Sequence, residues 1–345
     1  MAIIIGLIII AIGAFCQSSC YVPINKIKDW SWESYWFVQG VFAWLVFPLL
    51  GALLAVPAGH SLTELFASAP TFNVWMTIFF GVLWGVGGLT FGLSMRYLGV
   101  ALGQSIALGT CAGLGTIMGP VLLNIYFPEQ KPLESLTAAV IIGVVVTLIG
   151  IAIIGIAGHM KAQSLSEEEK KAAVKDFNFP KGIVIALLAG FMSGCFNVGL
   201  EFGKDINFGE LTNPMYSTLP ATLLVTLGGF VTNAVYCFYQ NSKNKTWSDY
   251  GKSAIWGNNL LFCALAGLLW YSQFFGLSLG KGFLTDSPTL TTFAFCILMA
   301  LNVVFSNVWG IILKEWKGVS KKTIVVLLIG IVVLIVSTFV PELLK

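Results

Sequence analysis

The chain has 345 residues, of which 57% are hydrophobic and 10% are charged, and its formal net charge is +3. So few charged residues leave nothing substantial from which to build a water-soluble domain, which excludes a soluble enzyme or binding module. The seven cysteines all fall in apolar stretches, which predicts small buried side chains rather than a disulfide framework or a metal site.

Ten stretches are long and apolar enough to cross a bilayer, because a hydrocarbon core about 30 Å thick needs about 20 helical residues. In chain order they are predicted at 2–24, 32–56, 72–95, 98–125, 136–158, 181–203, 216–241, 254–279, 289–313 and 323–341. The fold class that we expect is therefore an all-α polytopic membrane protein with ten transmembrane helices.

The distribution of basic residues predicts the orientation of these helices. The loops after the first, third, fifth, seventh and ninth spans hold fifteen of the lysines and arginines, and the opposite side holds four. Because basic residues concentrate on the cytoplasmic side, we expect both termini to be periplasmic in a bacterial inner membrane.

The longest polar interruption divides the chain nearly in half. We expect a five-helix half at 1–158, a cytosolic linker at 159–180 and a second five-helix half at 181–345. In the linker, Ser166 and Glu169 form a capping-box pattern for a short helix, and a solvated connection is favoured over a regulatory element. An odd number of helices per half places the halves in opposite orientations, as inverted repeats, and the similar stretches 141–146 and 328–333 agree with a duplication.

Small and polar residues mark helix faces that should point away from lipid. Glycines four residues apart at 81/85, 88/92, 99/103, 109/113 and 115/119 predict close helix contacts, although a moving helix would use the same smooth faces. In the sixth span, Ser193, Asn197 and Glu201 share one face. Because a polar side chain in lipid loses its hydrogen bonds, the amides and hydroxyls of the spans predict a polar, mostly uncharged pathway.

Three tryptophans, Trp44, Trp84 and Trp270, lie deeper in their spans than an interfacial belt explains. For any one of them, core packing is the simpler interpretation. Taken with the amides, they favour a neutral polyhydroxylated substrate, whose apolar ring face stacks on an aromatic plate and whose hydroxyls bind neutral side chains. The candidate substrate-binding residues are Gln17, Trp84, Asn197, Trp270, Gln273 and Asn302.

Several motifs resemble those of the L-rhamnose–proton symporter family, in the drug/metabolite transporter superfamily. They are Lys-Asp-Trp-Ser-Trp-Glu at 28–33, Trp-Gly-Val-Gly at 84–87, Gly-Leu-Ser-Met-Arg-Tyr-Leu-Gly at 92–99, Gly-Leu-Leu-Trp-Tyr-Ser-Gln-Phe-Phe at 267–275 and Leu-Lys-Glu-Trp at 313–316. The likeness runs in order from residue 21 to the last span. It implies ten helices in two inverted halves and uptake of a deoxy-sugar driven by protons.

A proton symporter needs a group that binds a proton on one side and releases it on the other. Ionisable residues within spans are candidates, and the two that stand out are Glu201 and Glu33. Glu33 could instead pair with a neighbouring lysine, and Glu201 with Lys204. The resemblance also suggests Arg96, Lys314 and Glu315 as members of a cytoplasmic gate.

Three other classes of membrane protein would show different features in the sequence. A facilitator or exporter of another small neutral metabolite would keep the polar pathway without proton dependence. An intramembrane enzyme would need a nucleophile–base pair, metal ligands or paired carboxylates, and a channel would need a filter-like loop; the sequence shows none of these. We expect no cofactor, no metal and no nucleic-acid partner.

Overall fold

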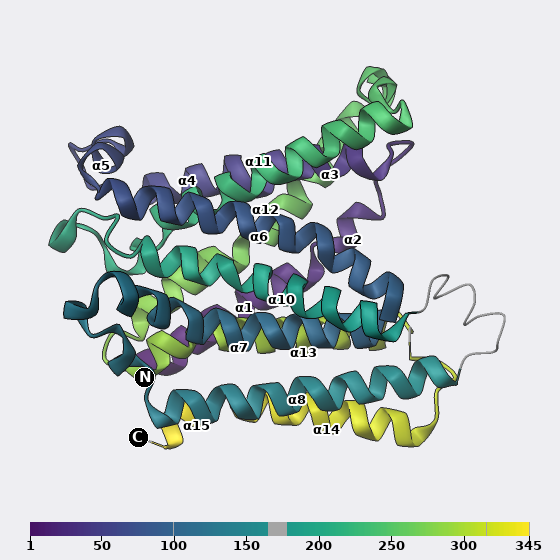
Figure 1. The fold of residues 1–345 in the computed structure, drawn as a ribbon. Helices are drawn as coiled ribbons and strands as arrows, with labels where there is room; N and C mark the ends of the chain where they lie inside the picture. Colours follow the sequence, from purple (N-terminus) through teal and green to yellow (C-terminus); the bar gives the residue numbers. More distant parts are fainter. Residues whose placement is uncertain (99, 165–177, 315, 345) are drawn as a thin grey trace. The chain divides into compact units, whose positions relative to one another are not determined.

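The computed structural model describes residues 1–98, 100–164, 178–314 and 316–344 (Figure 1). Most of the predicted linker, including its capping-box pattern, lies outside the described residues. Within the described ranges the chain is helical without strands. The helices are α1 (Ala2–Ser19), α2 (Tyr21–Ile24), α3 (Trp32–Gly40), α4 (Phe47–Leu54), α5 (Leu62–Ser68), α6 (Thr71–Leu98), α7 (Val100–Tyr126), α8 (Ala138–Gln163), α10 (Phe179–Phe202), α11 (Leu219–Asn244), α12 (Ser253–Phe283), α13 (Pro288–Ile312), α14 (Lys321–Ser337) and α15 (Val340–Leu343).

Nine segments of the described chain are helical, long enough and apolar enough to cross a membrane. They correspond to the first nine predicted spans, so the prediction of an all-helical polytopic membrane protein is confirmed. The tenth predicted span, 323–341, is divided between α14 and α15. With 17 residues, α14 covers roughly 25 Å at 1.5 Å per residue, less than the usual hydrocarbon thickness.

The second predicted span is a composite of three helical segments. Between α3 and α4 lies η1 (Val41–Val46), a π-helical segment in which the N–H of Phe47 donates to the carbonyl of Phe42, five residues earlier. Pro48 follows directly and has no N–H to continue an α-helical ladder. A wider turn just before a proline is a local solution to that missing donor, and π-helical turns are frequent at functional sites.

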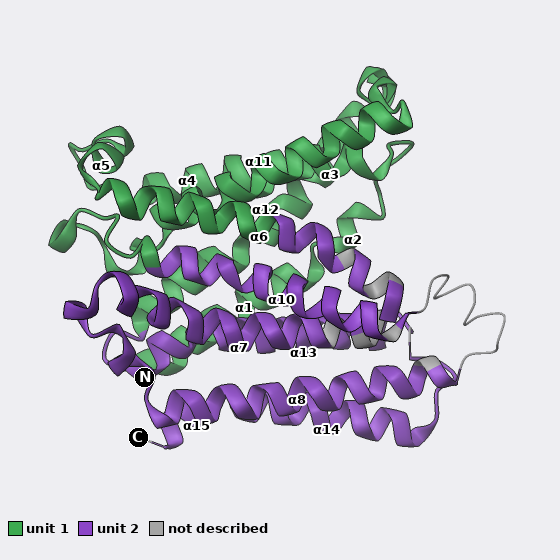
Figure 2. Cartoon of the chain, in the orientation of Figure 1, with its two compact units in different colours: residues 1–85, 202–283 green, residues 86–201, 284–345 purple. Residues whose placement is uncertain are grey.

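The chain forms two compact units, each drawing on both halves of the sequence (Figure 2). Unit 1 comprises residues 1–85 and 202–283, and unit 2 comprises residues 86–201 and 284–345. The helix α6 contributes its first part to unit 1 and its second part to unit 2. The two units are defined by which residues pack together, not by similarity between the two halves of the sequence. They therefore do not test the predicted five-helix halves.

In unit 1, α12 lies along α1, and it also contacts α3, η1 and α4. The backbones of α1 and α12 approach closely at Gly13 and Gly276, where a Cβ atom would meet backbone atoms of the other helix. Gly81 of α6 likewise faces the backbone of Val225 on α11. The glycine pair predicted at 81/85 therefore does mark a close helix contact, as expected where lipid offers no competing hydrophobic drive.

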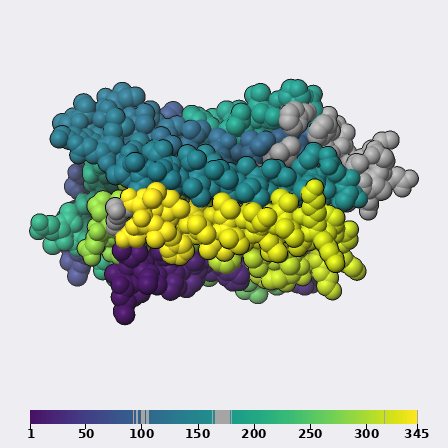
Figure 3. Space-filling model, turned by 90° about the horizontal axis from the view of Figure 1, so that it is seen from below, coloured from purple at the N-terminus to yellow at the C-terminus, as the bar shows by residue number. Residues whose placement is uncertain are grey.

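In unit 2, α14 lies along α8, and the two helices run in opposite directions (Figures 1 and 3). Gly150 of α8 faces Leu334, and Gly330 of α14 faces Ile154 in the same manner. One turn from the first of these contacts, the hydroxyl of Thr147 donates to that of Ser337 at 3.0 Å. Each helix thus offers a glycine notch to a larger aliphatic side chain of the other.

Candidate functional site

The three deep tryptophans form one cluster within unit 1. The ring of Trp44, on η1, makes edge contacts with Trp84 of α6 and Trp270 of α12 at centroid distances of 6.0 Å each, and the rings of Trp84 and Trp270 are 5.6 Å apart. Trp36 of α3 contacts Trp44 at 5.7 Å, and Phe274 contacts Trp270 at 5.3 Å. We call these five rings the tryptophan cluster. Such contacts between aromatic rings stabilise beyond the burial of area.

Glycines make room for two of these rings. A Cβ atom on Gly40 would lie 2.6 Å from ring atoms of Trp44, and one on Gly229 of α11 would clash with the ring of Trp84. The N–H of Trp36 is held separately, because it donates to Asn233 of α11 at 3.0 Å. The cluster is therefore positioned by five helical segments at once: α3, η1, α6, α11 and α12. Rigid aromatic surfaces of this kind suit the apolar face of a ring-shaped ligand.

Several polar atoms in the same unit are buried without a hydrogen-bond partner among the described residues. They are the indole N–H of Trp44, the amide oxygen Oε1 of Gln39, the hydroxyl of Tyr271 and the hydroxyl of Ser278. Gln39 is 2% exposed, Trp44 3% and Tyr271 4%. A buried polar group without a partner costs about 1–3 kcal/mol, so each one calls for an explanation such as a ligand or a water molecule.

The sequence-predicted substrate residues are divided between the two units. In unit 1, Trp84 and Trp270 meet in the cluster, and the amide Nε2 of buried Gln273 donates to the carbonyl of Trp270 at 3.1 Å. Gln17 is half-buried on α1. In unit 2, Asn197 on α10 and Asn302 on α13 are both buried.

Asn197 and Glu201 lie on a face of α10 that packs closely against α7 in unit 2. The amide Nδ2 of Asn197 donates to the carbonyl of Gly115 at 2.8 Å, while its Oδ1 is buried without a partner among the described residues. One turn further on, half-buried Glu201 lies over Gly119, where a Cβ atom would come within 2.7 Å of the glutamate Cγ. Gly119 thus lets the Glu201 side chain lie directly against α7, whereas Gly115 makes room for the ring of Phe295 and the backbone of Gly194.

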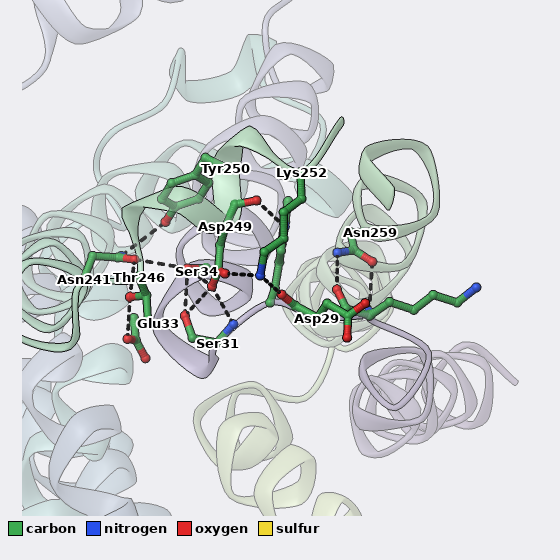
Figure 4. A network of polar contacts seen from close by, with 12 residues as sticks. Asp29, Ser31, Glu33, Ser34, Asn241, Thr246, Asp249, Tyr250, Lys252 and Asn259 are labelled. Carbon is green, nitrogen blue, oxygen red and sulfur yellow. Dashed lines mark hydrogen bonds and ion pairs between the residues drawn. The ribbon is translucent and has the colours of Figure 1, made fainter. Parts of the chain in front are cut away.

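Glu33 belongs to a polar network at the start of α3 (Figure 4). Its carboxylate accepts hydrogen bonds from the amide of Asn244 at 3.0 Å and the hydroxyl of Thr246 at 2.7 Å. The alternative prediction was an ion pair with a neighbouring lysine, and the structure instead joins Glu33 to the end of α11. These two hydrogen bonds hold the buried Glu33 side chain against the end of α11.

The centre of this network is Asp249, which the sequence analysis did not single out. It lies on the short helix η6 (Trp247–Gly251) and is 5% exposed. Its Oδ2 accepts from the backbone N–H and the hydroxyl of Ser31, both at 2.7 Å, and from the hydroxyl of Ser34 at 3.0 Å. Its Oδ1 lies 2.6 Å from the ammonium of Lys252. Burial alone would raise the pKa of Asp249, but these hydrogen bonds outweigh it and lower the pKa to about 2.

Around Asp249 the network reaches three further segments. The indole N–H of Trp30 donates to the backbone carbonyl of Asp249 at 2.8 Å. Asn259 of α12 accepts from the backbone N–H of Lys28 at 3.0 Å and donates to the Lys28 carbonyl at 2.8 Å. The network therefore ties the loop before α3 to α11, η6 and α12.

Of the three proposed gate residues, Lys314 alone has a side chain that the structure describes. Lys314 is exposed just after α13, with a left-handed backbone conformation at φ 61°. Glu315 lies outside the described residues, as does the side chain of Arg96. Each of the two aromatic residues that follow these positions in the sequence contacts a lysine from elsewhere in the chain: Lys161 lies 4.8 Å from the ring centre of Trp316, and Lys181 lies 4.6 Å from that of Tyr97.

Comparison with known proteins gives one consistent result. A family model described as L-rhamnose-proton symport protein matches residues 1–343. The L-rhamnose-proton symporters of Yersinia pestis (strain Pestoides F) and Yersinia pseudotuberculosis serotype O:1b (strain IP 31758) are each 32% identical to this chain over 344 residues. Each match covers 97% of this chain and 96% of the relative.

Proposed function

The chain belongs to the L-rhamnose-proton symport protein family, and we propose that it carries L-rhamnose, or a closely related deoxy-sugar, across the membrane together with protons. The observation that carries this proposal is the match of the family model to residues 1–343, essentially the whole chain. The protein is a membrane transporter, not an enzyme. The nine candidate spans among the described residues agree with a multi-pass protein.

We further propose alternating access between two inverted five-helix halves, with α14 as the tenth transmembrane helix. The antiparallel pair α8 and α14 supports this proposal, because the contact of Gly150 with Leu334 is mirrored by that of Gly330 with Ile154. A repeat related by a twofold axis would bring its equivalent helices together in this reciprocal way. The asymmetry of basic residues, fifteen against four, supports periplasmic termini and an inner-membrane location.

The tryptophan cluster is the proposed sugar site. Its rings offer an apolar surface deep in predicted spans, and neutral polar atoms of the same unit lack partners. A neutral sugar satisfies both features, whereas a phosphate or carboxylate would need basic residues, which the sequence does not place in the middle of any span.

For the proton site, the structure favours Glu201 over Glu33. The carboxylate of Glu33 already accepts two hydrogen bonds. Glu201 lies beside α7 one helical turn from Asn197, whose Oδ1 is free to accept a hydrogen bond from a protonated carboxyl. One proton entering down 100 mV supplies about 2.3 kcal/mol, enough for roughly 40-fold accumulation of a neutral sugar.

The test is uptake of radiolabelled L-rhamnose into proteoliposomes, with and without an imposed inward proton gradient. We expect gradient-driven accumulation by the wild type and its loss in Glu201→Gln, while sugar counterflow without a gradient survives in the variant. Glu210→Gln, at an exposed glutamate, is the matched control and should behave as the wild type. Accumulation retained by Glu201→Gln would transfer the proton role to Glu33, and gradient-independent equilibration by the wild type would indicate a facilitator.

A further inference from the structure

Three unpartnered polar atoms of unit 1 come from segments that pack on one another. Gln39 is on α3, Trp44 is on η1, and Tyr271 is on α12, which contacts both of those segments. Trp44 is a member of the tryptophan cluster, Gln39 directly precedes Gly40, which faces the Trp44 ring, and the hydroxyl of Tyr271 faces Gly51 of α4. The three residues are at least 96% buried, so bulk water does not satisfy these atoms.

The donor and acceptor properties of these three atoms restrict which kind of ligand could form hydrogen bonds with all of them. An indole N–H only donates, an amide oxygen only accepts, and a phenol hydroxyl does both. An anion would leave the amide oxygen of Gln39 without a donor, and a cation would leave the N–H of Trp44 without an acceptor. A sugar hydroxyl accepts and donates at once, so a group rich in hydroxyls serves all three.

We propose that Gln39, Trp44 and Tyr271 determine the sugar specificity of this transporter by binding hydroxyl groups of the sugar. The aromatic faces of Trp84 and Trp270 hold its apolar face. This inference rests on the proposed function and extends it to residues that the sequence analysis did not assign to the site.

The experiment measures counterflow of L-rhamnose and of its monodeoxy analogues, each lacking one hydroxyl, in proteoliposomes without a proton gradient. In the wild type, at least one analogue should have a KM about tenfold or more above that of L-rhamnose. In Gln39→Met and in Trp44→Phe, the KM of L-rhamnose should rise about tenfold, and the discrimination against the corresponding analogue should disappear.

A matched control is available in Trp30→Phe. Trp30 is also buried, but its N–H already donates to the carbonyl of Asp249. This variant should keep the wild-type ratio of KM values between sugar and analogues, and its unfolding midpoint without sugar should fall. Gln39→Met removes no hydrogen bond of the empty protein, so its midpoint should stay unchanged or rise.

The outcomes separate the two proposals. If Gln39→Met and Trp44→Phe raise the KM of every sugar by the same factor, the residues hold only water or structure, and the specificity role is overturned. A fall in the midpoint of Gln39→Met with unchanged KM ratios would overturn it as well. If the wild type exchanges L-rhamnose but does not accumulate it in response to a proton gradient, the symport mechanism alone is refuted. The specificity role would still be tested by the KM values of the analogues. Absence of any L-rhamnose counterflow in the wild type would overturn both.

Discussion

Replacing Asp249 by Asn should destabilise unit 1, because it removes one charge from the centre of a buried network. The carboxylate accepts three hydrogen bonds on Oδ2 and faces the Lys252 ammonium with Oδ1. The amide of an asparagine would either turn its NH₂ group toward Lys252 or lose the bonds from Ser31. Either arrangement leaves donors facing donors.

The magnitude follows from the lowered pKa. A fall from the ordinary value of 3.8 to about 2 corresponds to about 2 kcal/mol of stability for the charged form. Breaking a fully buried ion pair costs about 3–5 kcal/mol, but the Lys252 side chain is 42% exposed and can be hydrated when its partner is lost. We therefore expect a loss of about 2 kcal/mol rather than the larger value.

The assay is unfolding in detergent. At neutral pH it is followed with a thiol-reactive fluorogenic dye, because all seven cysteines, which lie in described ranges, are free and six of them are buried. The acid series is followed by tryptophan fluorescence instead, because the dye reacts with the thiolate, which is scarce at low pH. Since the pKa of Asp249 is lowered in the folded state, its stabilisation is complete above about pH 5 and is lost as the pH falls through 4 toward 2. The wild type should lose this increment on acidification, and Asp249→Asn should lack it throughout.

The control is Glu134→Gln. Glu134 pairs with Lys131 at the same three-residue spacing, but both side chains are more than 70% exposed, so no measurable change is expected. Equal stability of Asp249→Asn and the wild type at neutral pH would refute the reasoning. So would a parallel loss of stability in both proteins between pH 5 and pH 2.

Three further predictions concern close helix contacts and the second carboxylate. Gly330→Ala should destabilise the protein by about 1–3 kcal/mol in the same dye assay, because the added methyl meets Ile154 at 2.6 Å. Gly119→Ala should displace Glu201 and lower the ratio of proton-driven accumulation to counterflow. Glu33→Gln should lower the unfolding midpoint only slightly, because both donors bind Oε1 and the amide oxygen of glutamine replaces it as a weaker, uncharged acceptor. It should keep proton-driven accumulation.

Two glycines with open space around them are controls for the first two changes. Gly257→Ala on α12 should be neutral or slightly stabilising, since alanine is the better helix former. Gly88→Ala on α6 should leave the accumulation ratio as in the wild type. A normal ratio in Gly119→Ala would argue against Glu201 as the proton site, and loss of accumulation in Glu33→Gln would favour the other carboxylate.

The positions of the membrane spans could be predicted because they depend on local properties. A segment such as 138–161 is recognisable from its length and apolar composition alone, and the nine candidate spans of the described chain match the prediction. The last span was harder to place, since two short helices, α14 and α15, divide an apolar stretch that looks continuous in sequence. Glycine spacing at 81/85 and 115/119 predicted close contacts, but not which helix would make them.

The site could not be predicted in the same way, because it depends on contacts between residues that are far apart in the sequence. Trp44, Trp84 and Trp270 were each visible as deep aromatic residues, yet only folding brings their rings from three helical segments to within 6.0 Å of one another. Gln39 and Asp249 carried no local signal. Whether a buried polar atom is paired, like Asp249, or left open for a ligand, like Gln39, is decided by donors that lie hundreds of residues away or are absent. A hydrogen bond requires its two heavy atoms to lie about 3 Å apart in space, whatever their separation in the sequence. Periodicity and composition therefore cannot predict which residues form one.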